Sequence, residues 1–194
     1  MPEMKQAAVF LDRDGTINEE VGYLDDLGKL RIIPQAVQAI RLINGSGMLA
    51  VVVTNQSGVA RGYFTEAFVV SVHARLQELL QERGAHLDAF LYCPHHPTEG
   101  TEPYRTCCLC RKPAAGMLQQ AAGQWEIDLA RSYMIGDTLN DMAAAEKAGV
   151  KGVLVRTGYG RDAERDLAAA PVKPVHIAAD ILAAVSWIMR DRVT

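Results

Sequence analysis

The residues best suited to chemistry follow short apolar runs of the chain. Two carboxylates, Asp12 and Asp14, stand one residue apart directly after the run at 7–11. A third, Asp137, follows the run at 132–135. Carboxylates that converge on one point suit Mg²⁺, which takes hard oxygen ligands in an octahedron and keeps several waters. The pattern predicts a magnesium site formed by Asp12, Asp14 and Asp137.

The same residues support phosphoryl transfer. An aspartate can attack a phosphorus centre and form a covalent intermediate, and we expect this role for Asp12. Asp14 would act as the acid for the leaving group and the base for the incoming water. Thr54, with the backbone amides after it, and Lys112 would hold the phosphoryl oxygens and balance their charge. An Asp-x-Asp pair alone is often a solvated turn, but polar clusters at several run ends together favour an active site.

The four cysteines form a second group with a capacity for chemistry. They fall within one short stretch of the chain, at Cys93, Cys107, Cys108 and Cys110. With His95 they offer the thiolate and imidazole ligands of tetrahedral zinc. A full protein shell would make such a site structural, and metal binding would order its loop. His96 and Cys107 compete for the four positions, and one disulfide with two free thiols is the alternative.

A scaffold must bring the ends of the apolar runs together. Continuous rather than alternating hydrophobicity is typical of parallel strands covered by helices on both faces. We expect strands at 7–11, 48–53, 89–92, 132–135, 152–155 and 174–177. We expect helices at 34–44, 65–83, 114–122, 139–148 and 180–190. This alternation predicts an α/β fold with one doubly wound, Rossmann-like parallel sheet, in which ligands bind beyond the carboxyl ends of the strands.

Length and composition set outer limits on the function. The 194 residues, 49% hydrophobic and 22% charged, predict one globular domain over 1–194. The net charge of −3 argues against nucleic-acid and membrane-surface partners. The first apolar run is too short for a signal peptide or a bilayer span, so we expect a cytoplasmic protein. We also expect a monomer. In that reducing setting, clustered cysteines more often bind metal than form disulfides.

In chain order, these residues resemble the four motifs of the haloacid dehalogenase (HAD) superfamily of phosphatases. The motifs here are Asp12-Arg13-Asp14-Gly15-Thr16, Val53-Thr54-Asn55-Gln56, Arg111-Lys112-Pro113, and Gly136-Asp137 followed by Asp141. Within the superfamily, segments 54–62 and 93–113 are similar to the heptose-bisphosphate phosphatase family. The resemblance covers about 7–157. It implies a Mg²⁺-dependent phosphatase without a separate cap domain, acting on a small phosphorylated sugar in the biosynthesis of nucleotide-activated heptose.

The resemblance also implies roles for individual residues. Asp12 is the nucleophile and Asp14 the acid/base, with Asp14 holding Mg²⁺ through its backbone carbonyl. Thr54 and Lys112 stabilise the transferring group. The zinc ligands are Cys93, His95, Cys108 and Cys110, in a loop at about 93–110. The substrate-binding residues are Glu20, Val21, Gly22, Tyr23, Asn55, Gln56, Ser57 and Arg111.

One departure from the pattern and two alternative functions stay open at this point. Thr138 stands where relatives often carry a basic residue, which leaves the anomer or substrate preference undecided. Histidinol-phosphate phosphatases share the catalytic motifs and the zinc loop. A receiver-like signalling module also uses an aspartate with Mg²⁺ on a doubly wound sheet, but Asp14 beside Asp12 favours turnover. A zinc module for nucleic acid conflicts with the negative net charge.

Overall fold

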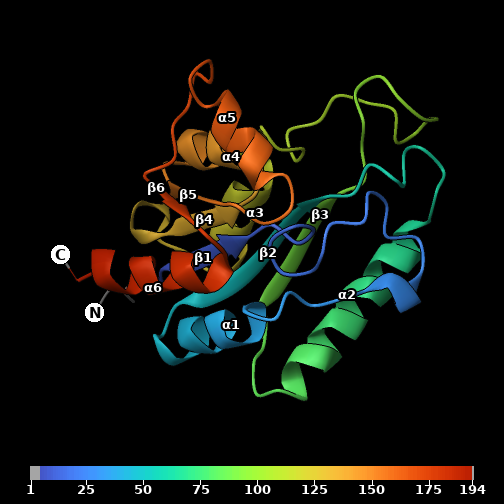
Figure 1. The fold of residues 1–194 in the computed structure, drawn as a ribbon. Coiled ribbons are helices and arrows are strands. Elements are labelled where there is room, and N and C mark those ends of the chain that lie inside the picture. Colours follow the sequence, from blue (N-terminus) through green and yellow to red (C-terminus); the bar gives the residue numbers. More distant parts are fainter. Residues whose placement is uncertain (1–4, 194) are drawn as a thin grey trace.

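The computed structural model describes residues 5–193 and is built on one parallel sheet (Figure 1). Its strands are β1 (Ala8–Leu11), β2 (Leu49–Asn55), β3 (Ala89–Cys93), β4 (Tyr133–Gly136), β5 (Lys151–Val155) and β6 (His176–Ala178). Their spatial order is β3-β2-β1-β4-β5-β6, and all neighbours are parallel. The predicted doubly wound sheet is confirmed, and β1, which leads into Asp12, lies inside it.

Helices cover both faces of the sheet (Figure 1). They are α1 (Ala36–Gly45), α2 (Glu66–Gln81), α3 (Gly116–Gln124), α4 (Leu139–Ala148), α5 (Gly160–Asp166) and α6 (Ile181–Asp191). Helices α1, α2 and α6 bury their apolar sides in one core cluster. Helices α3 and α4 bury their apolar sides in a second core cluster, and α5 packs beside α4 in a small third one.

Strand β1 shows why the apolar runs are continuous. Val9 and Leu11 belong to the core beneath α1 and α6, whereas Ala8 and Phe10 belong to the core beneath α3 and α4. Successive side chains of a strand point to opposite faces, so a strand covered on both faces must be apolar at every position.

The start of α4 fixes the position of the residues after β4. Thr138 and Asp141 form a capping box at its N-terminus, as the sequence predicts. Gly149 ends the helix with a φ of 73°. Because Asp137 directly precedes the N-cap residue Thr138, the cap fixes the backbone that carries Asp137 at the carboxyl edge of the sheet.

Most boundaries lie within two residues of expectation, and the larger differences concern α3, the last strand and α5. Helix α3 begins at Gly116 and runs on to Gln124, and the last strand is His176–Ala178. Helix α5 was not expected at all. Its sequence is mostly polar and buries only two small residues, Gly160 and Ala163, so it carries almost no apolar periodicity.

Two long connections lie around the carboxyl edge of the sheet, at 14–33 and 94–113 (Figure 1). Apart from the short 3₁₀ helix Leu27–Lys29, neither contains a helix or a strand longer than an isolated bridge. None of the helices within 5–193 combines the length and the apolar character needed to cross a bilayer.

Candidate active site

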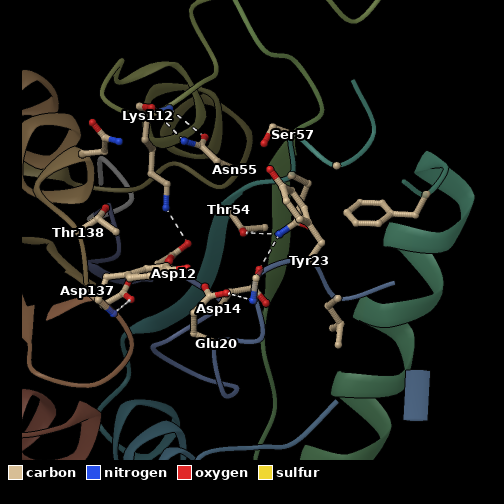
Figure 2. Close-up of a pocket in the computed structure, with 17 residues that line it drawn as sticks. Asp12, Asp14, Glu20, Tyr23, Thr54, Asn55, Ser57, Lys112, Asp137 and Thr138 are labelled. Carbon is tan, nitrogen blue, oxygen red and sulfur yellow. Dashed lines mark hydrogen bonds and ion pairs between the residues drawn. The ribbon is translucent and has the colours of Figure 1, made fainter. Parts of the chain in front are cut away.

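A cavity of about 270 Å³ opens at the carboxyl edge of the sheet (Figure 2). Its walls come from the segments after β1, β2, β4 and β5, from the 20–24 segment and from the end of the cysteine loop. The lining residues are Asp12, Asp14, Glu20, Gly22, Tyr23, Leu24, Thr54, Asn55, Gln56, Ser57, Gly58, Phe64, Lys112, Asp137, Thr138, Asn140 and Tyr159. The three polar clusters expected at the strand ends therefore meet in one place.

Asp12 sits at the floor of this cavity. Its backbone N–H donates to the carbonyl of Ile135 at 2.9 Å, which extends the β1–β4 ladder by one residue. Its carboxylate accepts from Nζ of Lys112 at 2.7 Å. Burial raises the pKa of Asp12 to about 7 against the opposing effect of Lys112. The carboxylate is thus positioned by the sheet and needs positive charge to remain ionised.

Lys112 is the buried cation of the site. Its Nζ lies 2.7 Å from Asp12 and 2.6 Å from Asp141, and it also donates to the carbonyl of Val53 at 2.8 Å. Burial alone would lower the pKa of Lys112, but the two carboxylates raise it above its usual value. The side chain of Asn55 bonds both the N–H and the C=O of Lys112, at 3.0 and 2.9 Å. These two hydrogen bonds tie the backbone of Lys112 to the end of β2.

Asp137 reaches the same point from the end of β4. Its Oδ2 accepts from the backbone N–H of Tyr159 at 2.8 Å, whereas its Oδ1 is buried without a hydrogen-bond partner. A Cβ added at Gly15 (φ 79°) or at Gly158 would collide with this carboxylate. The two glycines therefore let the backbone close over Asp137. Burial and the neighbouring charges of Asp12 and Asp141 raise its pKa to about 9.

The carboxylates fit a divalent cation. Oxygens of Asp12, Asp137 and Asp141 lie within 4.8 Å of one another, and the single ammonium of Lys112 offsets only one of the three negative charges. Asp141 is already engaged by Lys112 and by both the N–H and the hydroxyl of Thr138. Asp12 and the unpartnered Oδ1 of Asp137 are the atoms best placed to hold Mg²⁺, which binds through one or two carboxylates and keeps several waters.

The Asp14 carboxylate is turned to a different set of partners. It pairs with the buried Arg13 at 2.8 Å and accepts from Asn18 and Gln56 at 2.9 Å each. Burial alone would raise the pKa of Asp14, but Arg13 and these hydrogen bonds hold it below its usual value. Gln56 also donates to the hydroxyl of Thr54 at 2.8 Å, which leaves the Thr54 proton for an acceptor in the cavity. The binding of Mg²⁺ by the backbone carbonyl of Asp14 stays a prediction.

The cysteine loop gathers one compact group of ligands. The Sγ atoms of Cys93, Cys108 and Cys110 lie 3.0 to 3.5 Å apart. Nδ1 of His95 lies 3.4 Å from Cys110. These distances far exceed the roughly 2.05 Å of a disulfide and suit four ligands around one ion. The hydrogen bond between Cys110 and Cys93, against the effect of burial, lowers the pKa of Cys110 to about 5.

The structure brings together the four side chains that the resemblance implied as zinc ligands, Cys93, His95, Cys108 and Cys110. Cys107 is exposed and lies outside the cluster. Nδ1 of His96 accepts from the backbone N–H groups of Thr98 and Glu99 instead. The loop has a second anchor on α2, where Glu66 accepts hydrogen bonds from Tyr92 and Tyr104, at 2.8 and 2.7 Å.

Two residues expected to bind substrate lie outside the cavity wall. Arg111 donates to the backbone carbonyl of His95 at 3.1 Å, and Val21 is exposed in the 14–33 connection. All the other residues expected at the catalytic, substrate and magnesium sites line the cavity.

Several lining residues were missed from sequence. They are Leu24, Gly58, Phe64, Asn140 and Tyr159. Tyr159 follows β5, so the strand-end rule applied to that strand could have found it. Phe64 and Leu24 carry no signal that distinguishes them from packing residues. Asp141 was identified only as a motif and cap residue, whereas here it also binds Lys112.

Known proteins resemble this chain in both sequence and structure. A HAD-hydrolase-like family model matches residues 109–184. The D-glycero-D-manno-heptose-1,7-bisphosphate 7-phosphatase of Thermosynechococcus vestitus is 43% identical over 189 residues, 95% of this chain and 96% of that protein. The D-glycero-beta-D-manno-heptose-1,7-bisphosphate 7-phosphatase of Escherichia coli K12 is 48% identical over 152 residues, 78% of this chain and 80% of that protein. The crystal structure of D,D-heptose 1,7-bisphosphate phosphatase from B. bronchiseptica, complexed with magnesium and phosphate, has a TM-score of 0.84 at 32% identity and covers 96% of this chain and 99% of its own.

Proposed function

Because the chain belongs to the D-glycero-D-manno-heptose-1,7-bisphosphate 7-phosphatase family of HAD-like hydrolases, we propose that it removes the 7-phosphate of this sugar bisphosphate. It is a phosphoric monoester hydrolase, with a role in making nucleotide-activated heptose for surface polysaccharide. The observation that carries the proposal is the placement of Asp12, at the end of a central strand, between a buried lysine and the Asp137 carboxylate.

In the first step, one carboxylate oxygen of Asp12 attacks the phosphorus of the 7-phosphate. A bond forms between that oxygen and phosphorus, and the bond from phosphorus to the sugar oxygen breaks. Asp14, which lines the same cavity, gives a proton to the departing sugar oxygen. The hydroxyl of Thr54 and the ammonium of Lys112 hold the transferring oxygens.

In the second step, water cleaves the aspartyl phosphate. Asp14 takes a proton from the attacking water, the bond between phosphorus and the Asp12 oxygen breaks, and inorganic phosphate leaves. Asp12 returns as a carboxylate held by Lys112. The same two carboxylates thus serve both steps.

Two metal ions complete the proposed enzyme. Asp12, Asp137 and the backbone carbonyl of Asp14 would hold Mg²⁺, which when bound neutralises charge on the phosphoryl oxygens. Cys93, His95, Cys108 and Cys110 would hold a structural Zn²⁺ that orders the loop leading into Lys112.

The remaining parts of the proposal concern the whole chain. We place 1–194 in one phosphatase domain, with the zinc loop at about 93–110. Glu20, Gly22, Tyr23, Asn55, Gln56 and Ser57 would contact the sugar phosphate from the cavity wall, and Arg111 and Val21 from its rim. We expect a cytoplasmic monomer without nucleic-acid or membrane partners, and light scattering of the purified protein tests the monomer.

The test is the position of phosphate release. Purified protein with Mg²⁺ is incubated with D-glycero-D-manno-heptose 1,7-bisphosphate, and ³¹P NMR follows which phosphate leaves. We expect loss of the 7-phosphate over many turnovers, and no turnover after Asp12→Asn or with EDTA. A higher kcat/KM for histidinol phosphate would overturn the substrate assignment. A stable phospho-protein without release would favour a signalling role.

A further inference from the structure

The two oxygens of the Asp14 carboxylate are held unequally. Oδ1 accepts from Nε and Nη2 of Arg13, at 3.2 and 3.0 Å, and from Asn18 at 2.9 Å. Oδ2 accepts from Nη2 of Arg13 at 2.8 Å and from Gln56 at 2.9 Å. A carboxylate has about four lone-pair positions, so these five hydrogen bonds saturate its ionised form, and Asp14 takes up the proton it donates only when a donor to Oδ2 is released. Oδ1, with three hydrogen bonds, is the more firmly held atom, whereas Oδ2 has two, one of them from Gln56, which also contacts Thr54 in the cavity wall.

The anchor depends on the fixed orientation of Arg13. Its side chain is only 1% exposed, so the guanidinium can exchange no hydrogen bond for water. Two of its three nitrogens bond Asp14, and the third, Nη1, lies 3.3 Å from Nε2 of His73. A guanidinium is planar and has no acceptor, so His73 must present a bare Nε2 lone pair.

His73 is itself immobile and neutral. It lies on the buried side of α2, and its ring stacks on Phe90 with 4.8 Å between centroids and 21° between planes. The ring of Tyr92 contacts His73 in a T-shaped arrangement, with 5.8 Å between centroids. Burial and the nearby Arg13 charge lower the pKa of His73 to about 3, so the ring accepts from Arg13 throughout the neutral range.

Resting on the proposed function, we propose that His73 is a positioning residue for the general acid: by accepting from Arg13, it fixes the guanidinium that holds Oδ1 of Asp14. Oδ2 is thereby aimed at the oxygen of the leaving group. Without the acceptor, Nη1 is buried unpaired, Arg13 shifts to seek a partner, and Asp14 loses its orientation. Misplacement of a proton donor by a fraction of an ångström slows proton transfer strongly.

The test compares two substitutions and two leaving groups. His73→Phe keeps a flat ring on Phe90 but has no acceptor, whereas His73→Gln can offer a carbonyl oxygen near the same place. A sugar phosphate leaves as an alkoxide and needs the acid, whereas p-nitrophenyl phosphate leaves as a stable phenolate and needs it far less. For His73→Phe we expect kcat/KM to fall about tenfold on the heptose bisphosphate and less than about threefold on the aryl phosphate. His73→Gln restores most of the loss.

The outcomes separate the possible reasons for failure. Equal losses on both substrates, or equal losses in the Phe and Gln variants, would show that His73 only supports packing. An unchanged rate in His73→Phe would also overturn the role. If the Phe variant does not fold, His73→Leu replaces it. If the wild-type protein releases no 7-phosphate, but His73→Phe loses more kcat/KM on another alkyl phosphate than on the aryl phosphate, the proposed substrate fails while the positioning role stands.

Discussion

Replacing Lys112 by methionine tests the electrostatic design of the site most directly. The change removes one ammonium from between Asp12, at 2.7 Å, and Asp141, at 2.6 Å, while keeping an unbranched chain of similar length. Lys112 is 3% exposed, so no water can replace it. Removing one partner of a buried ion pair costs about 3–5 kcal/mol because the other charge is left uncompensated.

Two measurable effects follow from the loss of this cation. In metal-free buffer the free energy of unfolding should fall by about 3–5 kcal/mol, which for a chain of this size lowers Tm by about 10 °C. With saturating Mg²⁺, kcat should fall by about 10²–10³, because a preorganised donor to the transferring oxygens is gone. Calorimetry measures the first effect and continuous phosphate release the second.

An exposed lysine provides the matched control. Lys29 forms an ion pair of the same length with Asp25, at 2.6 Å, but is 53% exposed. Solvent screens such an exposed pair, so it contributes little to stability, and Lys29→Met should leave both Tm and kcat nearly unchanged. If Lys112→Met retained kcat within tenfold of the wild type, or lost no more stability than Lys29→Met, the assigned role of the buried lysine would be refuted.

Two further outcomes are expected. Atomic absorption should find one zinc per chain in the wild type and none in Cys108→Ser, which should also have a lower Tm. Cys107→Ser, one residue away and exposed, should change neither the zinc content nor Tm. Zinc retained in Cys108→Ser would contradict the ligand set. The folded pKa of His73, about 3, lies below its unfolded value of about 6.5, so the unfolded state binds the extra proton and stability is lost as pH falls below 6.5. Between pH 8 and pH 5 this costs about 2 kcal/mol, and urea unfolding at both pH values should show a smaller loss for His73→Gln; an identical loss would contradict it.

Much of the site was predictable because of where the strands end. Asp12, Thr54 and Asp137 each follow a buried apolar run, and parallel strands bring such positions to one edge. The rule needs no knowledge of loop conformation. It would also have reached Tyr159 if it had been applied to β5.

What could not be predicted depends on the paths of the loops and on contacts between side chains. The pairing of Lys112 with Asp141 requires the 94–113 connection to turn back over β2, which no local pattern specifies. Likewise, the sequence around His73 predicts only a helix. The contact of His73 with Arg13, 60 residues away, arises from the packing of α2 on the sheet. The quartet of zinc ligands needed the resemblance to be separated from Cys107 and His96.

The anchoring of the cysteine loop has a consequence for the timing of turnover. The loop is fastened to β3 by the ligand cluster, to β2 through Asn55 and to α2 through Glu66. A wall fixed to three elements cannot swing open and shut as a hinged domain does. We therefore expect the substrate to enter and phosphate to leave through a mouth that stays open, so that bond cleavage rather than a closing motion sets the pace of each cycle.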